Sequence, residues 1–250
     1  MPLAKYVDAG AAMAPRPVFP AANQLLRELP SNEHAAFMAD CEPVTLMFGE
    51  VLVEPGGFIE QVYFPVDGFI SLIVSLDGGD RLEVAMAGRE GMMGVSLLLG
   101  VEESPLCALV QGAGMALRMD ATRFQRLLPY CPVLQQRLQR YLYVLMNQLA
   151  RTAACTHFHQ VEARLARWLL MTQDRAGSNR LQLTHEFLAA MLGVRRAGIT
   201  QAATVLQKRA LISYHRGNII VLDRPGLIEV SCSCYFADCS LYSQVLDDHR

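Results

Sequence analysis

The spacing of the hydrophobic residues changes once along this chain, near Asp120, and that change limits the folds the chain can adopt. From about Val44 to Met119, short runs rich in β-branched and aromatic residues are separated by Gly, Pro and Asp. Short strands with turns this frequent are typical of an antiparallel sandwich or barrel. From Asp120 onward the hydrophobic residues recur at helical spacing. The sequence therefore predicts an N-terminal antiparallel sandwich or barrel followed by a series of helices.

Turn residues divide the first part of the chain into elements. Residues 21–40 are expected to be helical, with Asn23 as an N-cap and a restart at Ser31 after Pro30. Four later runs are the clearest strand candidates, namely Val51–Val53, Val62–Phe64, Phe69–Leu76 and Arg81–Met86.

The longest predicted helix runs from about Val133 to Thr156. Five leucines fall on one face of it, and these are Leu134, Leu138, Leu142, Leu145 and Leu149. Such a face packs either on its own domain or on a second copy of the chain. We favour the second alternative, so these leucines are the predicted interface of a homodimer. A further helix is expected over 159–172.

Charge is unevenly distributed along the chain. The 250 residues have a formal net charge of −2, yet residues 157–224 contain 10 Lys and Arg against 4 Asp and Glu, a net charge of +6. A basic segment in an acidic chain indicates a polyanionic partner for that segment, although a solvated basic face would look the same. The absence of an apolar stretch of roughly 18–20 residues argues against a membrane span, and without an export signal we expect a cytoplasmic protein.

The most informative segment runs from Leu183 to Leu206. Thr184 is a good N-cap for a helix of two turns, and Gly193 then supplies the conformation that lets the chain leave that helix sharply. A second helix begins near Arg195. This is the helix-turn-helix arrangement, in which the second helix enters the major groove of DNA with its N-terminus first.

The outer face of the second helix carries side chains suited to bases and phosphates. Arg can donate two hydrogen bonds to guanine, Gln can bond adenine, and Thr suits a phosphate or a thymine methyl. A predicted hairpin over 211–222 follows, with Arg216 at its tip. The predicted DNA-binding residues are Thr184, Arg195, Arg196, Thr200, Gln201, Thr204, Lys208 and Arg216.

These features together resemble the Crp/Fnr regulators, over roughly residues 25–230. The stretches that carry the resemblance are Val62–Pro65, Gly68–Leu72, Glu90–Gly94, Phe187–Val194 and Leu211–Ile212. The resemblance implies an α+β fold with an N-terminal antiparallel β-roll, a jelly roll like those that bind cyclic nucleotides, followed by a long dimerisation helix and a C-terminal winged helix-turn-helix. It also implies a homodimer on a palindromic double-stranded operator, with RNA polymerase as a further partner.

Under this resemblance the chain divides into five segments. They are a flexible N-terminus (1–20), a β-roll sensor domain (21–130), a dimerisation helix (131–156), a winged helix-turn-helix DNA-binding domain (157–230) and a Cys-containing C-terminal tail (231–250).

The expected effector pocket departs from the cyclic-nucleotide pattern of the family. In members that bind cyclic nucleotides, a Gly-Glu pair and an Arg-Ser or Arg-Thr pair hold the phosphate. Here Val95 follows Gly94, and Leu106 and Cys107 stand near the Arg-Ser position. A buried phosphodiester needs a bidentate cation, so we predict that this chain does not bind cyclic AMP in the usual way. Whether an apolar interior or another effector fills these positions stays open.

The cysteines give no clear signal. Their number is odd and no export signal is visible, so reduced thiols are expected. Cys232, Cys234 and Cys239 form one local group, for which a metal or iron–sulfur site, a redox-reactive tail and no role at all are open alternatives. A role of His157 and His159 beside Cys155 in holding a metal or haem is a further alternative. Because metal sites usually use C-x₂-C spacing, we assign no metal and no cofactor.

No motif for catalysis is present: the chain has no Gly-x-Ser-x-Gly, no phosphate-binding loop with Lys and no His-Glu-x-x-His. The sequence therefore predicts a DNA-binding transcription regulator that is not an enzyme. The alternative is a sensor or interaction protein of the same architecture that acts through its β-roll without specific DNA readout.

Overall fold

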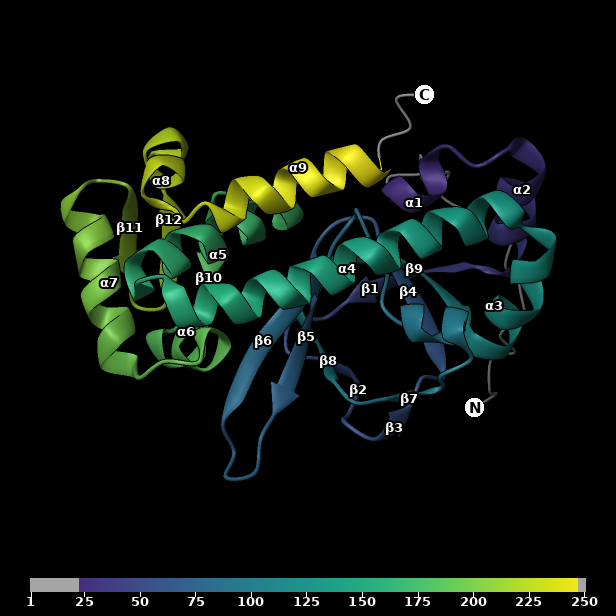
Figure 1. Cartoon of the computed structure of the whole chain (residues 1–250), viewed down its shortest axis with the longest axis horizontal. Coiled ribbons are helices and arrows are strands. Elements are labelled where there is room, and N and C mark those ends of the chain that lie inside the picture. The colour runs from purple at the N-terminus through teal and green to yellow at the C-terminus, as the bar shows by residue number, and fades with distance from the viewer. Residues whose placement is uncertain (1–22, 247–250) are drawn as a thin grey trace, which may run out of the picture.

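The computed structural model describes residues 23–246, which form a β-roll joined to a helical domain (Figure 1). The two main sheets of the β-roll are antiparallel throughout. One has the order β1-β9-β4, with bounds Glu42–Leu46, Gly114–Asp120 and Gln61–Pro65. The other has the order β2-β8-β5-β6, with bounds Val51–Val53, Cys107–Gly112, Phe69–Ser75 and Arg81–Ala87. A short pair joins β3 (Gly57–Phe58) to β7 (Glu103–Ser104). The predicted α+β class is confirmed.

Short helices surround the β-roll and complete its core. They are α1 (Gln24–Arg27), α2 (Ser31–Asp40), η1 (Val95–Leu99), α3 (Ala121–Leu127) and η2 (Leu128–Tyr130). Asn23 caps α1 as predicted, because its side chain accepts a hydrogen bond from the backbone of Leu25 at 3.0 Å. Its amide also donates to the carbonyl oxygens of Pro65 and Gly91, each at 2.9 Å. Asn23 therefore fixes α1 on the β-roll.

Helix α4 (Pro132–Phe158) lies along the β-roll and continues to the helical domain (Figure 1). Its Tyr141 is fully buried and donates to the carbonyl oxygen of Met92 at 3.2 Å. The approach is possible because Gly91 has no side chain: a Cβ there would lie 2.4 Å from the Tyr141 hydroxyl oxygen. The helix thus packs tightly on the β-roll of its own chain.

The predicted dimer face of α4 requires a correction. Leu134, Leu138 and Leu145 are buried in the core of this chain's own β-roll, so these three cannot contact a second copy. Leu142 and Leu149 are partly buried at the edge of the same core. A leucine stripe at helical spacing shows that a face is covered, but not which partner covers it.

The helical domain contains α5 to α9 and a three-stranded sheet of order β10-β12-β11. The helices are α5 (Val161–Ala176), α6 (His185–Leu192), α7 (Arg196–Lys208), α8 (Arg224–Val230) and α9 (Cys234–Leu246). The strands are β10 (Arg180–Gln182), β11 (Ile212–His215) and β12 (Asn218–Val221). No helix within residues 23–246 is long and apolar enough to cross a bilayer.

The C-terminal segment that was expected to be a tail contains a docked helix. In Figure 1, α9 (yellow) runs back beside α4 toward α1. The Tyr242 hydroxyl donates to Gln148 of α4 at 3.1 Å, and Leu246 is buried in the core of the β-roll. The predicted flexible segment 1–20 lies outside the described residues.

Buried polar contacts join the β-roll to the helical domain. The Glu83 carboxyl on β6 accepts from the Ser71 hydroxyl at 2.5 Å and from the Trp168 indole of α5 at 2.7 Å. Burial raises the pKa of Glu83 to about 7. Nearby, Arg175 of α5 pairs with Glu90 at 2.7 Å. These contacts hold α5, and with it the rest of the helical domain, against the β-roll.

Candidate nucleic-acid interface

The first helix of the motif, α6, is capped at both ends. The Thr184 hydroxyl accepts a hydrogen bond from the backbone of Phe187 at 3.1 Å, as expected of the predicted N-cap. Gly193 ends the helix with φ of 59°. The backbone N–H of Val194 then donates to the carbonyl of Ala189 at 2.9 Å, as in a Schellman motif. This sharp exit sets the angle at which α7 leaves.

Helix α7 has one buried and one exposed face. The buried face packs in the core of the helical domain and consists of Ile199, Ala202, Ala203 and Leu206. The residues predicted to contact DNA are exposed, and these are Thr184, Arg195, Arg196, Thr200, Gln201, Thr204, Lys208 and Arg216. Arg195 stands at the N-cap position and makes no side-chain cap. The structure thus leaves the N-terminal end of α7 accessible to a ligand.

Two of the predicted DNA contacts use their hydroxyl groups on the helix itself. Thr200 donates to the carbonyl of Arg196 at 3.1 Å, and Thr204 donates to the carbonyl of Thr200 at 2.7 Å. The hydroxyl protons are therefore occupied. The methyl groups and the oxygen lone pairs of Thr204 remain for a ligand, whereas the Thr200 oxygen also lies 3.0 Å from Nδ1 of His185.

His185 has a positioning role that the sequence did not reveal. Its Nδ1 lies 3.0 Å from the Thr200 hydroxyl, and its ring stacks on Tyr214 of β11 at 4.1 Å between centroids. Burial lowers the pKa of His185, and the charge of Arg196 lowers it further. A neutral imidazole therefore joins α6, α7 and the hairpin. Its position directly after the Thr184 cap was the only sequence signal.

The hairpin β11-β12 forms the predicted wing. Arg216 and Gly217 both have positive φ, 46° and 82°, which is the geometry of a tight hairpin turn of type I′. The carbonyl of Gly217 accepts from the backbone of Leu183 at 2.6 Å, so the turn is tied to the segment that leads into α6. Arg216 is exposed at the tip.

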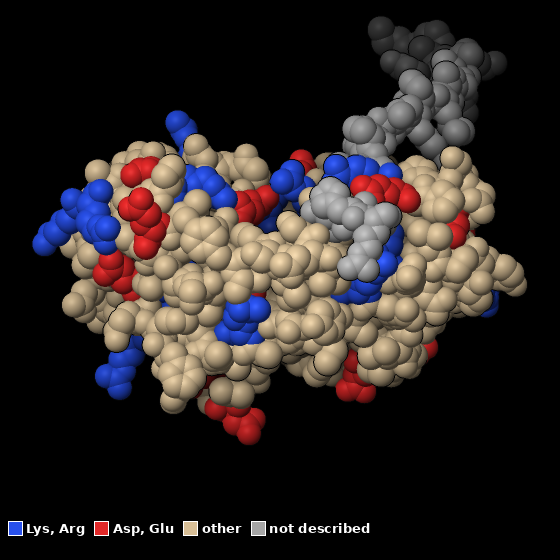
Figure 2. All heavy atoms as spheres, turned by 45° about the horizontal axis from the view of Figure 1, so that its top comes forward, with Lys and Arg blue, Asp and Glu red and all other residues tan. Residues whose placement is uncertain are grey.

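Much of the positive charge counted in the sequence is not on the surface. Arg164, Arg167 and Arg175 are buried in α5, and Arg224 pairs with Asp174 at 2.6 Å. The other six basic residues of the segment are exposed: Arg180, Arg195, Arg196, Lys208, Arg209 and Arg216. Figure 2 shows Lys and Arg side chains projecting at the end of the molecule formed by the α7 region, with acidic side chains among them. The basic surface is therefore smaller than the net charge of the segment implied.

Two of the residues predicted for an effector pocket, Val95 and Cys107, pack in separate clusters. Val95 lies in the core of the β-roll, next to Gly94 at the start of η1. Cys107 instead packs with Ile73 and with Met191 of α6 in a separate cluster. Alternating residues of a strand face opposite sides, and Cys107 points toward the helical domain. Cys107 of the β-roll thus packs in a cluster that includes Met191 of the helix-turn-helix.

The cysteine group of the C-terminal segment separates into two parts. Cys232 and Cys234 are buried beside Cys155, with His159 next to them. Cys239 is exposed on α9 and is not a member of this group. His157, also considered from the sequence, is exposed.

Comparison with known proteins agrees with this geometry. A family profile described as the Crp-like helix-turn-helix domain matches residues 163–230. The chain contains a Crp-like helix-turn-helix domain. No curated protein sequence matches the chain.

Solved structures extend the similarity beyond the Crp-like domain. FixK2 from Bradyrhizobium japonicum superposes with a TM-score of 0.65 at 14% identity, covering 77% of this chain and 98% of that one. The c-di-GMP-responsive global regulator CLP of Xanthomonas campestris gives 0.63 at 17% identity, covering 77% and 99%. A putative Crp/Fnr regulator from Eubacterium rectale gives 0.63 at 16% identity, covering 82% and 96%. The chain therefore has the fold of Crp/Fnr transcription regulators.

Proposed function

We propose that this chain is a sequence-specific DNA-binding transcription regulator that acts as a homodimer on a palindromic operator. One observation carries the proposal: α7 is held rigidly by its apolar face, while its N-terminal end presents unpaired side chains. Within residues 23–246, Arg195 and Arg196 make no ion pair, and both are exposed. Side chains that are free and preorganised suit hydrogen bonding to base edges.

The proposed contacts divide by chemistry. Arg196 and Gln201 are the base-reading candidates, since both can form bidentate hydrogen bonds in the major groove. Lys208 and Arg216 lie at the end of α7 and at the wing tip, where they suit phosphates and position the helix. Thr184 and Arg195, at the starts of the two helices, suit the phosphate backbone beside the groove.

A dimer interface on α4 is supported by a different face from the one predicted. Tyr143, Met146, Ala150 and Ala153 are exposed and recur every three or four residues, as in the seam of a coiled coil. Two chains joined along this stripe would present two α7 helices to successive major grooves, about one helical turn apart. This stripe replaces the five leucines as the proposed interface.

The dimer is tested with a matched pair of variants. Met146 is 60% exposed on the stripe, and Met47 is 63% exposed on the β-roll. We expect M146E to give a monomer by light scattering and to lose palindrome binding, whereas M47E stays dimeric. A dimeric M146E would place the interface elsewhere.

The sensor is proposed to work without cyclic AMP, because the residues at the expected phosphate positions do not surround a common site. Calorimetry with cyclic AMP should show no binding or millimolar binding, and micromolar binding would contradict the proposal. RNA polymerase is a proposed partner on analogy with the fold alone.

The whole proposal is tested by selecting binders from a random DNA pool at two salt concentrations. An enriched palindrome with a steep salt dependence would support it. If only weak, salt-sensitive binding without enrichment remained, the alternative of a protein that acts through its β-roll would be favoured.

A further inference from the structure

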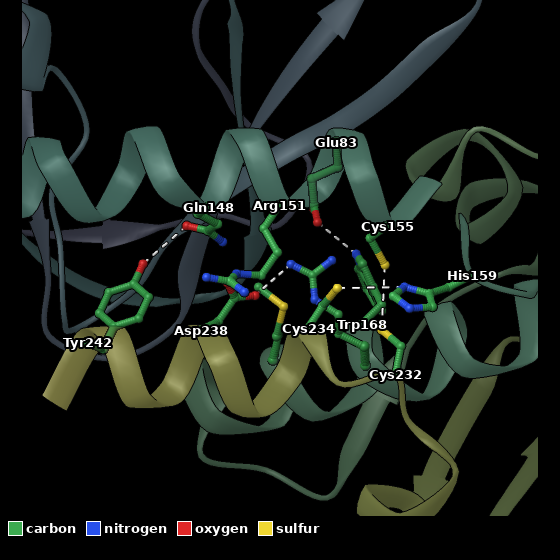
Figure 3. Close-up of polar contacts among 12 residues, drawn as sticks. Glu83, Gln148, Arg151, Cys155, His159, Trp168, Cys232, Cys234, Asp238 and Tyr242 are labelled. Carbon is green, nitrogen blue, oxygen red and sulfur yellow. Dashed lines mark hydrogen bonds and ion pairs between the residues drawn. The ribbon is translucent and has the colours of Figure 1, made fainter. Parts of the chain in front are cut away.

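Four side chains that commonly bind metals meet at the junction between the two domains (Figure 3). Cys155 lies near the end of α4, His159 directly follows that helix, and Cys232 and Cys234 lie where α8 leads into α9. The sulfurs of Cys155 and Cys232 are 3.5 Å apart, and the Cys234 sulfur lies 3.6 Å from Nδ1 of His159. All four ligand atoms lie within 4.8 Å of one another.

These distances approach those of a tetrahedral metal centre. With Zn–S of about 2.3 Å and Zn–N of about 2.0–2.1 Å, a regular tetrahedron has sulfur–sulfur edges of about 3.8 Å and sulfur–nitrogen edges of about 3.6 Å. The two measured contacts are close to these values, and the longest edge needs to shorten by roughly 1 Å. We propose that Cys155, His159, Cys232 and Cys234 bind one Zn²⁺ ion as a structural centre.

The charges around the cluster support an anionic centre. Three thiolates, a neutral imidazole and Zn²⁺ carry a net charge of −1, and binding releases the three thiol protons. Arg164 and Arg167 are both buried. Negative charge on the sulfurs of Cys155 and Cys232 raises the pKa of each guanidinium, against the lowering by burial. Arg167 pairs with Asp238 at 2.6 Å, but within residues 23–246 Arg164 has no carboxylate partner. A buried cation without a counterion is unfavourable, and a zinc–thiolate centre would supply one.

The burial and number of the ligands indicate a structural zinc site and not a catalytic one. The three cysteines are buried, and four protein ligands leave no open position for water or a substrate. The ion would therefore hold structure together and would not perform chemistry. It would link the end of α4 to the start of α9, and so hold the C-terminal helix on the dimerisation helix.

The competing chemistry is a disulfide between Cys155 and Cys232. The 3.5 Å contact is much longer than a sulfur–sulfur bond of about 2.05 Å. A disulfide also gives no reason for Cys234 and His159 to join the pair. Soft thiolates with one imidazole are a donor set that selects Zn²⁺.

The sequence analysis assigns no metal, because metal sites usually use C-x₂-C spacing and a single residue separates Cys232 from Cys234. The other two ligands are Cys155, in the last turn of α4, and His159, which caps the C-terminal end of that helix. The fold brings the two pairs of ligands together over a separation of 77 residues between Cys155 and Cys232.

The test uses the full chain purified under reducing conditions, with metal content measured by mass spectrometry. We expect about one Zn²⁺ per chain, and Co²⁺ added to the metal-free chain should give the absorption of a tetrahedral thiolate site. C155S and C232S should each lose most of the bound zinc. The matched control is C239S, which removes an exposed cysteine five residues after the ligand Cys234 and seven after Cys232, and it should keep the ion.

Three outcomes would overturn the proposal. They are a wild-type chain that neither contains zinc nor shows the tetrahedral Co²⁺ spectrum, iron in place of zinc, and loss of the metal in C239S as large as in C232S. The Co²⁺ titration uses the wild-type chain, so it remains decisive if C155S or C232S fails to fold. A Cys155–Cys232 disulfide found by peptide mapping of a metal-free chain would identify a redox pair instead.

Discussion

Arginine has opposite roles in α5 and at the start of α7. In α5, Arg167 and Arg175 are buried and pair with Asp238 and Glu90 at 2.6 and 2.7 Å. Around α7, Arg195 and Arg196 are exposed, and within the described part of the chain neither makes an ion pair. In the buried set, Arg175 joins α5 to the β-roll and Arg167 joins α5 to α9. The exposed set is available to a partner.

The difference teaches that a count of charges along a sequence mixes two physical situations. A buried guanidinium must be compensated inside the protein, whereas an exposed one is free to displace counterions from a polyanion. Variants that treat the two sets separately can break or sharpen this comparison.

The largest effect is expected from Arg175→Met. Burial lowers the pKa of Arg175, but the charge of Glu90 together with Tyr242, Tyr141 and Asp174 outweighs burial and raises that pKa. Removing the cation leaves Glu90 charged and nearly buried, which should lower the free energy of unfolding by about 3–5 kcal/mol in urea denaturation. The double variant with Glu90→Gln should recover much of the loss. Equal stability of R175M and the wild type would show that the buried set is not structural.

Glu83 gives a pH test of the same junction. Its pKa is about 7 in the fold against 4.5 ordinarily, since burial outweighs Ser71, Trp168 and the charges of Arg175 and Arg167. The folded carboxyl holds its proton more tightly than the unfolded one. Its contribution to stability is thus complete below pH 4.5 and is lost as the pH rises through about 7.

In the wild type, the free energy of unfolding should fall between pH 5 and 8. We expect the fall to be about 1–3 kcal/mol smaller in Glu83→Gln, which has no carboxyl group to titrate. Glu60→Gln, at an exposed position, is the control and should keep the wild-type slope. Parallel pH profiles for E83Q and the wild type would contradict a buried, protonated Glu83.

Arg196→Ala tests the exposed set. We expect a loss of about 1–3 kcal/mol in binding to the selected operator and relaxed preference at one base pair. The melting temperature should not change, because the side chain is exposed. A uniform loss across all DNA sequences would make Arg196 a phosphate contact.

Arg216→Gly should have the smallest effect, and it should change stability and DNA binding in opposite directions. Arg216 has φ of 46°, a conformation that costs a side-chain-bearing residue about 1–2 kcal/mol, so Gly should stabilise the wing slightly. The slope of affinity against salt should fall by about 1, as for one lost phosphate contact. A variant that is no more stable and binds DNA equally would show that Arg216 is a plain turn residue.

The sequence predicted the elements well where local patterns determine them. The strands at Val51–Val53 and Phe69–Ser75, and the stops at Thr184 and Gly193, all follow from short-range chemistry. The exposed face of α7 followed from its helical period.

Three features could not be predicted from local sequence patterns, because each depends on which elements pack against each other in the tertiary structure. The leucines of α4 face the β-roll, Cys107 faces α6, and α9 packs on α4 instead of forming a tail. The meeting of Cys155 with Cys232 likewise needs the tertiary path of α5 to α8.

The docking of Leu246 in the β-roll has a consequence for how the molecule is made. Domains generally fold in the order in which they leave the ribosome, N-terminal first. Here the core that contains Leu25 and Phe37 is completed by a residue at the far end of the described chain. The β-roll can therefore reach its final packing only after the helical domain has been synthesised. Both domains would then mature in one late step, and a nascent β-roll would persist as an incomplete intermediate until that step.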